Sequence, residues 1–119
     1  MTEQQTMWSI NETTSIKTYT LANFRTIPEI QQMSEEAQFE MEVVGNVLPF
    51  KTNNYVVEQL IDWNNIPKDP MFVLTFPQKG MLIPEHYDKM ASTLKSGADR
   101  KEIQRVANDI RLKLNPHPA

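Results

Sequence analysis

The sequence predicts an all-α fold: a small bundle of four to five helices, with a long irregular apolar loop and a disordered N-terminal leader. Apolar residues recur at helical spacing in several segments, and capping residues and prolines stand where those helices would begin. A chain of 119 residues is long enough for one domain with a modest core. We expect a flexible leader at 1–23, a helical domain at 24–114 and a linker at 115–119.

The leader is predicted from composition. Residues 1–23 hold six threonines and two serines, with scattered large apolar residues that follow neither a helical nor an alternating repeat. They lack the basic stretch and apolar run of a signal peptide, and no apolar run in the chain is long enough to cross a membrane. The sequence therefore predicts a cytoplasmic protein without a membrane partner.

Two helices are expected before residue 50. Thr26 and Glu29 form a capping-box pattern around Pro28, which suits a first helical turn, and this short helix should end near Met33. Ser34 is a candidate N-cap for the next helix. Its core stripe consists of Phe39, Val43, Val44, Val47 and Leu48, and Pro49 ends it. Gly45, inside this helix, is predicted to mark a close helix crossing.

A third helix is expected from a cap at Thr52 or Asn53 to Asp62. Its inward positions should be Val56 and Leu60, together with Val57 and Ile61. The apolar segment 71–76 that follows is open to three interpretations: a strand, a helical turn or a loop. A helical turn or loop is favoured because Asp69–Pro70 suits the N-cap and first position of a short helix.

Two further helices complete the predicted bundle. Pro84 begins the first, whose stripe is Tyr87, Met90, Ala91 and Leu94, and Gly97 stands where a helix C-terminus favours glycine. Asp99 and Glu102 form a capping box for the last helix. Its stripe is Ile103, Val106, Ala107, Ile110 and Leu114, and the prolines of "NPHPA" end it.

Several kinds of chemistry are disfavoured by residue types. The chain has no cysteine, which excludes disulfides, thiolate metal sites and a cysteine nucleophile within it. The only histidines, His86 and His117, lack metal-binding spacing, so we expect His86 to be solvated and His117 to lie in the linker. A formal net charge of −3 argues against a nucleic-acid partner, despite the small basic surplus of the last helix.

One long stretch carries a family resemblance. "YVVEQLIDWNNIPKDPMFVLTFPQKGML", continued by "PEHYDKMASTLKSG" and "IRLKLNPHPA", resembles the N-terminal region of lysine 2,3-aminomutase-family radical SAM proteins. The resemblance covers residues 27–119. The family-motif segment, for which we expect a structural or interface role, comprises Tyr55, Leu60, Ile61, Asp62, Trp63, Asn64, Asn65, Pro67, Asp69, Pro70, Phe76 and Pro77.

The resemblance also implies cofactors and a reaction that depend on residues outside this chain. Members of the family bind a [4Fe–4S] cluster through C-x3-C-x2-C, cleave S-adenosylmethionine, and in many cases use pyridoxal phosphate to move an amino group between adjacent carbons. Because this chain has no cysteine, we expect an inactive N-terminal domain, with 115–119 leading toward an absent catalytic barrel. No catalytic, cofactor-binding or metal residue is assigned within it. The resemblance also implies a homo-oligomeric parent.

The parent's substrate stays open, as lysine or a related amino acid. The best-known lysine mutases carry "N-D-P-x-R-K-Q" where this chain has "KDPMFVLTFPQKG". An alternative hypothesis is a self-contained interaction module that binds a partner through its apolar loop. A domain that packs on a barrel predicts exposed or mobile Phe72, Leu74 and Phe76, whereas burial of all three would favour the self-contained module.

Overall fold

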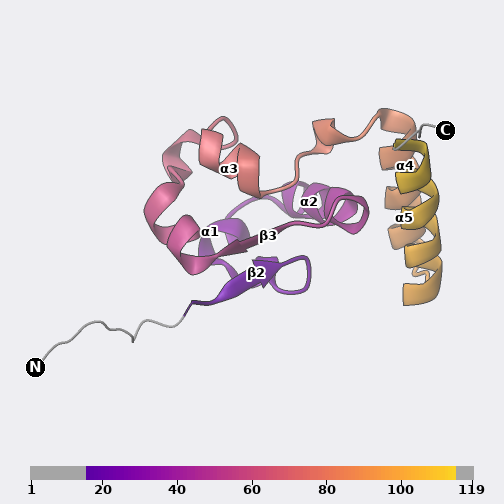
Figure 1. Ribbon diagram of the computed structural model, residues 1–119, viewed down its shortest axis with the longest axis horizontal. Coiled ribbons are helices and arrows are strands. Elements are labelled where there is room, and N and C mark those ends of the chain that lie inside the picture. Colours follow the sequence, from indigo (N-terminus) through magenta and orange to yellow (C-terminus); the bar gives the residue numbers. More distant parts are fainter. Residues whose placement is uncertain (1–15, 115–119) are drawn as a thin grey trace, which may run out of the picture.

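The computed structural model describes residues 16–114. The α-helices and strands are β2 (Thr18–Thr20), α1 (Pro28–Gln31), α2 (Glu35–Val47), β3 (Lys51–Asn53), α3 (Pro70–Thr75), α4 (Pro84–Lys95) and α5 (Arg100–Leu114). Single turns of 3-10 helix lie at Phe24–Thr26, Trp63–Asn65 and Lys79–Met81, and a π-helical turn at Val56–Leu60. Figure 1 shows α2 between the paired helices α4 and α5 and a group that contains α1, α3 and the strands. The chain is mostly helical, as predicted.

The all-α prediction is wrong in one respect, because β2 and β3 form a small antiparallel sheet. Thr18 pairs with Asn53, and Tyr19 with Thr52. Tyr19 is buried, so residues 16–23 belong to the folded part and not to a leader. A three-residue strand with one inward side chain gives no detectable repeat in the sequence. The remaining leader residues, 1–15, and the linker, 115–119, lie outside the described residues.

The first helix starts one residue later than its capping pattern predicts. The Thr26 hydroxyl donates to the Asn23 carbonyl at 2.7 Å, and Ile27 occupies the N-cap position without a side-chain cap. Pro28 lies in the first turn, as expected. Asn23 holds the preceding turn closed, since its Oδ1 accepts from the Thr20 N–H at 2.8 Å and its amide donates to the Thr18 carbonyl.

Helix α2 begins as predicted, with Ser34 Oγ accepting a hydrogen bond from the Ala37 N–H at 3.0 Å. Gly45 marks a close approach, but not a helix crossing. A Cβ added there would lie 3.1 Å from side-chain atoms of both Leu21, in the turn after β2, and Phe50, just before β3. The space is needed by two side chains that cover the helix, so the predicted crowding is right and its partner is wrong.

The predicted third helix is present but short: residues 54–60 are helical, most of them as a π-helical turn, and they directly follow β3. Asn53 does cap this turn, since its Oδ1 accepts from the Val56 N–H at 3.0 Å. The Ile61 N–H reaches back five residues to the Val56 carbonyl, and this wider turn changes which positions face inward. Val57 and Ile61 are buried as expected, whereas Leu60 is exposed, contrary to the prediction.

Segment 71–76 is a helical turn, which is one of the interpretations that the sequence left open. Helix α3 begins at Pro70 after the Asp69 cap. Phe72 and Phe76 are each only 1% exposed, so the expected exposure of these two side chains is wrong. Leu74 is 77% exposed, because its position on α3 faces away from the core. Burial of all three side chains is therefore not observed either.

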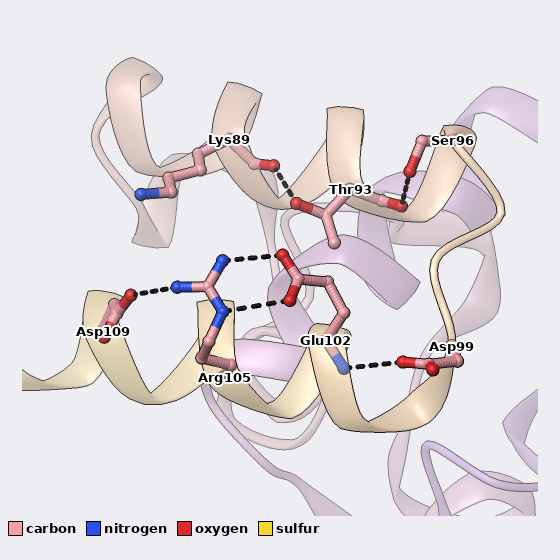
Figure 2. Close-up of polar contacts among 7 residues, drawn as sticks. All are labelled: Lys89, Thr93, Ser96, Asp99, Glu102, Arg105 and Asp109. Atoms are coloured by element: carbon pink, nitrogen blue, oxygen red, sulfur yellow. Dashed lines mark hydrogen bonds and ion pairs between the residues drawn. The ribbon is translucent and has the colours of Figure 1, made fainter.

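Helices α4 and α5 start where the sequence predicts, and α4 also stops as predicted. Pro84 lies in the first turn of α4, and Gly97 ends it with a φ of 78°. Asp99 Oδ1 accepts from the Glu102 N–H at 2.9 Å (Figure 2). The Glu102 side chain bonds Arg105 instead of returning to the cap, so the predicted capping box is only half formed.

Two hydrophobic clusters form the core of the described residues. One joins α2 to α4 and α5 through Val43, Val44, Val47, Leu82, Tyr87, Met90, Ala91, Val106, Ala107 and Ile110. The other lies on the opposite side of α2 and consists of Tyr19, Phe24, Ile27, Ile30, Met41, Val57, Ile61, Phe72 and Phe76. Helix α2 contributes to both clusters and is the element that connects them.

Candidate functional site

The inner residues of the family-motif segment build an aromatic cluster. The Trp63 ring lies 5.7 Å from Phe72 and 6.2 Å from Phe76, measured between centroids, and the two phenylalanine rings stack at 5.2 Å. The Trp63 indole N–H donates to the Val57 carbonyl at 2.8 Å, which satisfies its buried polar end. Ile61 lies in the same hydrophobic cluster. These side chains hold the segment against the rest of the fold.

The two aspartates of the segment are helix caps. Asp62 Oδ1 accepts from the Asn64 N–H, and Asp69 Oδ2 accepts from the Phe72 N–H, each at 3.0 Å. A carboxylate at such a position satisfies a backbone donor that the first turn leaves unpaired. Asp69 is buried and is followed by Pro70 in the first turn of α3. Both aspartates therefore have a structural role.

Other motif residues point outward. Tyr55 and Leu60 are exposed, and so are Asn64, Asn65 and Pro70. Val73 and Leu74, within the same segment, are also exposed large apolar residues. The structure thus divides the segment between an inner group that packs and an outer group that faces solvent. The outer apolar residues are available for contact with another surface.

A cleft of about 550 Å³ lies between α2 and residues 66–80. We call it the methionine cleft, and its apolar lining is Met33, Met41, Ile66, Pro67, Phe72 and Pro77. Glu40 and Lys79 supply charge to its lining. Its size is that of a site for a small ligand or an anchoring side chain, and methionine adapts to the shape of what binds. Two motif prolines thus meet at one cleft, although they are ten residues apart.

The predicted solvation of His86 is wrong. Its side chain is only 8% exposed, and among the described residues its Nδ1 has no hydrogen-bond partner. The first turn of α4 is turned inward, because Leu82 before it and Tyr87 within it both belong to the α2–α4–α5 cluster. The lack of metal-binding spacing in the sequence does not distinguish a solvated histidine from one that is packed in the core. His117 lies outside the described residues.

Arg111 makes a long-range contact that was not expected from the sequence. Its guanidinium donates to the Val47 carbonyl at 2.7 Å and to the Asn46 carbonyl at 3.0 Å, which are last-turn carbonyls of α2. A third N–H donates to Asn108 Oδ1 at 2.7 Å. In the sequence, Arg111 is only one of the basic residues that give the last helix a small excess of positive charge. Nothing in a single sequence indicates which carbonyls an arginine will reach.

The charged network on α5 is a surface feature (Figure 2). Arg105 contacts Glu102 at 2.6 Å and Asp109 at 3.1 Å, and all three side chains are largely exposed. The hydrogen bond from Arg105 lowers the pKa of Glu102, and the same bond raises the pKa of Arg105. Within residues 16–114, no three His, Asp or Glu side chains are grouped as a metal site would require.

The fold and these features define a small, mostly helical domain with two outward-facing candidate sites: the exposed apolar residues of the motif segment and the methionine cleft. None of the helices in the described range has the length and apolarity needed to span a bilayer. Comparison of the chain with models of protein families, with curated proteins and with solved structures found no match.

Proposed function

We propose that the chain is the N-terminal helical domain of a lysine 2,3-aminomutase-like radical SAM protein of the cytoplasm, a packing and subunit-interface domain without activity of its own. The observation that carries the proposal is the amino-acid sequence of the segment from Tyr55 to Leu82. That stretch and its continuation resemble the family over a length at which a chance match is improbable. The reaction of the parent would be a 1,2-amino migration on lysine or a related amino acid, catalysed in its barrel.

The geometry of the motif segment supports a packing role. Its inner side chains and its caps are used to fix the backbone, which leaves exposed apolar side chains such as Leu60 and Leu74 in fixed positions. Several exposed apolar side chains contributed by one segment are typical of a surface that contacts another protein surface. The proposal assigns that surface to the barrel or to a second subunit.

The cofactors of the family do not fit the residues of this chain. A [4Fe–4S] cluster requires thiolate ligands, and the chain has no cysteine. No lysine of the chain matches a motif position to which pyridoxal phosphate can be assigned. The domain therefore contributes no residue that we can place in the chemistry, and its contribution is structural.

The test is the coding sequence beyond codon 119. We expect the reading frame to continue into a segment with C-x3-C-x2-C spacing, and a stop codon directly after Ala119 would contradict the proposal. A biochemical test is independent of the gene. The chain alone, supplied anaerobically with iron, sulfide, a reductant and S-adenosylmethionine, should form neither a cluster nor 5′-deoxyadenosine.

A second candidate is a self-contained module that binds a separate protein through the exposed apolar residues of segment 55–77. The 77% exposure of Leu74 favours it as much as the first proposal. The two differ in what Leu74→Asp does. In the parent enzyme, the substitution should weaken subunit association or activity, whereas in a free-standing module it should abolish capture of a partner and leave the chain's own stability unchanged.

A further inference from the structure

A second hollow, distinct from the methionine cleft, lies between α5 and the segments that flank α2 and the strands. It has a volume of about 760 Å³, within the range of ligand-binding sites. Leu21 and Phe50 form one apolar wall, and Ile103 and Ala107 of α5 form the other. We call this hollow the basic groove, because of the charges that line it.

The charge of the groove is opposite to that of the chain. The chain has 15 acidic and 12 basic residues, yet the groove is lined by Lys51, Arg100 and Arg111 and by no aspartate or glutamate. In the part of the chain that the structure describes, Lys51 and Arg100 form no ion pair with a carboxylate. Positive charge beside an apolar floor is therefore left unbalanced, and an anionic partner would complement it.

Arg111 gives the groove a fixed wall. Three of its N–H groups are held by the Val47 and Asn46 carbonyls and by Asn108. A guanidinium has five N–H donors, so donors remain for a ligand while the group is already oriented. A preorganised cation loses little conformational freedom when an anion binds.

The spacing of the cations along α5 favours an extended partner with more than one acidic group. Arg100 and Arg111 are 11 residues apart on α5, which corresponds to roughly 16 Å along the helix axis. A partner with two acidic groups can therefore engage both arginines along the groove. Two acidic side chains about 11 residues apart on a helix, or about five apart on an extended segment, would match this length. Three cations are also few for a nucleic acid, whose affinity depends on many phosphate contacts.

We propose that the basic groove binds an acidic, amphipathic segment of a partner protein, with apolar side chains on the floor and carboxylates toward Arg100 and Arg111. The proposal rests on the shape and charge of this groove, so it holds or fails separately from the proposed enzyme family. It also concerns a different surface from the exposed residues of segment 55–77.

The experiment begins with selection of peptides from a random displayed library against the 119-residue protein. We expect enrichment of peptides with apolar residues and at least two acids at the spacing given above. Titration of a selected peptide into isotope-labelled protein should shift the NMR resonances of Phe50, Ile103 and Gln104. Replacing its acids by lysine should weaken binding at least about tenfold. Absence of acidic enrichment, or shifts confined to another face, would overturn the proposal.

Matched charge reversals locate the site. Arg100→Glu should weaken peptide binding about tenfold, and Lys101→Glu, at the adjacent exposed position outside the groove, should change it less than about threefold. Circular dichroism should show both variants folded. Equal loss in the two variants would reject the groove. Equally tight binding of glutarate or ATP at the same residues would make it a small-anion site, and dimerisation abolished by Arg100→Glu would identify a second copy as its occupant; either result overturns the proposal.

Discussion

Asp69 shows how a motif residue can be structural. Its buried carboxylate accepts from the Phe72 N–H and so fixes the start of the turn that carries both buried phenylalanines. A sequence motif alone does not distinguish this role from a functional one, because aspartate serves both. The hydrogen-bond partner decides between them.

Replacement of Asp69 tests this role through stability. We expect Asp69→Ala to lower the free energy of unfolding by about 1–2 kcal/mol, because a backbone donor loses its cap in a buried place. Asp69→Asn should recover most of the loss, since its amide oxygen can accept the same bond. Urea denaturation followed by circular dichroism measures the effect. Asp88→Ala, at an exposed position within α4, is the control and should be nearly neutral.

Glu102 gives a prediction with a defined pH dependence. Its pKa is lowered in the folded chain, chiefly by the hydrogen bond from Arg105. The pair therefore stabilises the fold above the ordinary pKa of glutamate, and that contribution is lost as the pH falls through the lowered value. NMR titration of the side-chain carboxyl should show the pKa rising in Arg105→Gln and unchanged in Lys101→Gln. An unchanged value in both variants would mean that the ion pair is not formed in solution.

The helices whose starts are marked by a capping residue or a proline were predictable from the sequence. Ser34, Pro84 and Asp99 each mark a helix start within one turn of their own position, and the structure confirms all three. The pairing of β2 with β3 was not predictable, because it joins Thr18 to Asn53 across the whole of α2. Local spacing carries no information on such a contact.

The candidate sites also differ in how far the sequence predicts them. The motif segment was identified from its sequence resemblance to a known family. Which of its side chains face inward depends on the π-helical turn and on α3. The methionine cleft and the basic groove each combine residues from segments far apart in the sequence. Neither has a local signature, although Arg100, Gln104 and Arg111 do share one face of α5.

The contact of Arg111 with the end of α2 links two elements and can be tested. Arg111→Met should lower the free energy of unfolding by about 1–3 kcal/mol, because the Val47 and Asn46 carbonyls lose a charged donor at a helix C-terminus. Arg105→Met is the control on the same helix. Since its ion pairs are exposed, its midpoint in urea should barely change. Equal effects would show that the Arg111 contact adds nothing specific.

For the whole molecule, α2 is the element on which both hydrophobic clusters depend. Val44 is fully buried in one cluster, while Met41 of the same helix belongs to the other. Loss of packing on one side of α2 should therefore be felt on the other side. This arrangement favours a single cooperative unfolding transition over independent unfolding of two parts.

Val44→Ala tests this coupling. The substitution should cost roughly 2 kcal/mol, since it removes two buried methyl groups and leaves a cavity. In a Trp8→Phe background, Trp63 fluorescence reports one cluster and the Met90 methyl resonance reports the other. We expect both denaturation midpoints to fall together. A shift in the Met90 signal alone would show that the clusters unfold independently, and Val73→Ala, at an exposed site, should move neither signal.

Strand β2 has a consequence for any shortened form of the protein. A boundary drawn at residue 24, where the helical pattern of the sequence begins, would remove Tyr19 from its cluster and leave β3 without its neighbour. The backbone N–H and C=O groups that now meet β2 would then be open to a strand from another molecule. Such a truncated chain would be expected to aggregate at concentrations at which the longer chain stays dispersed.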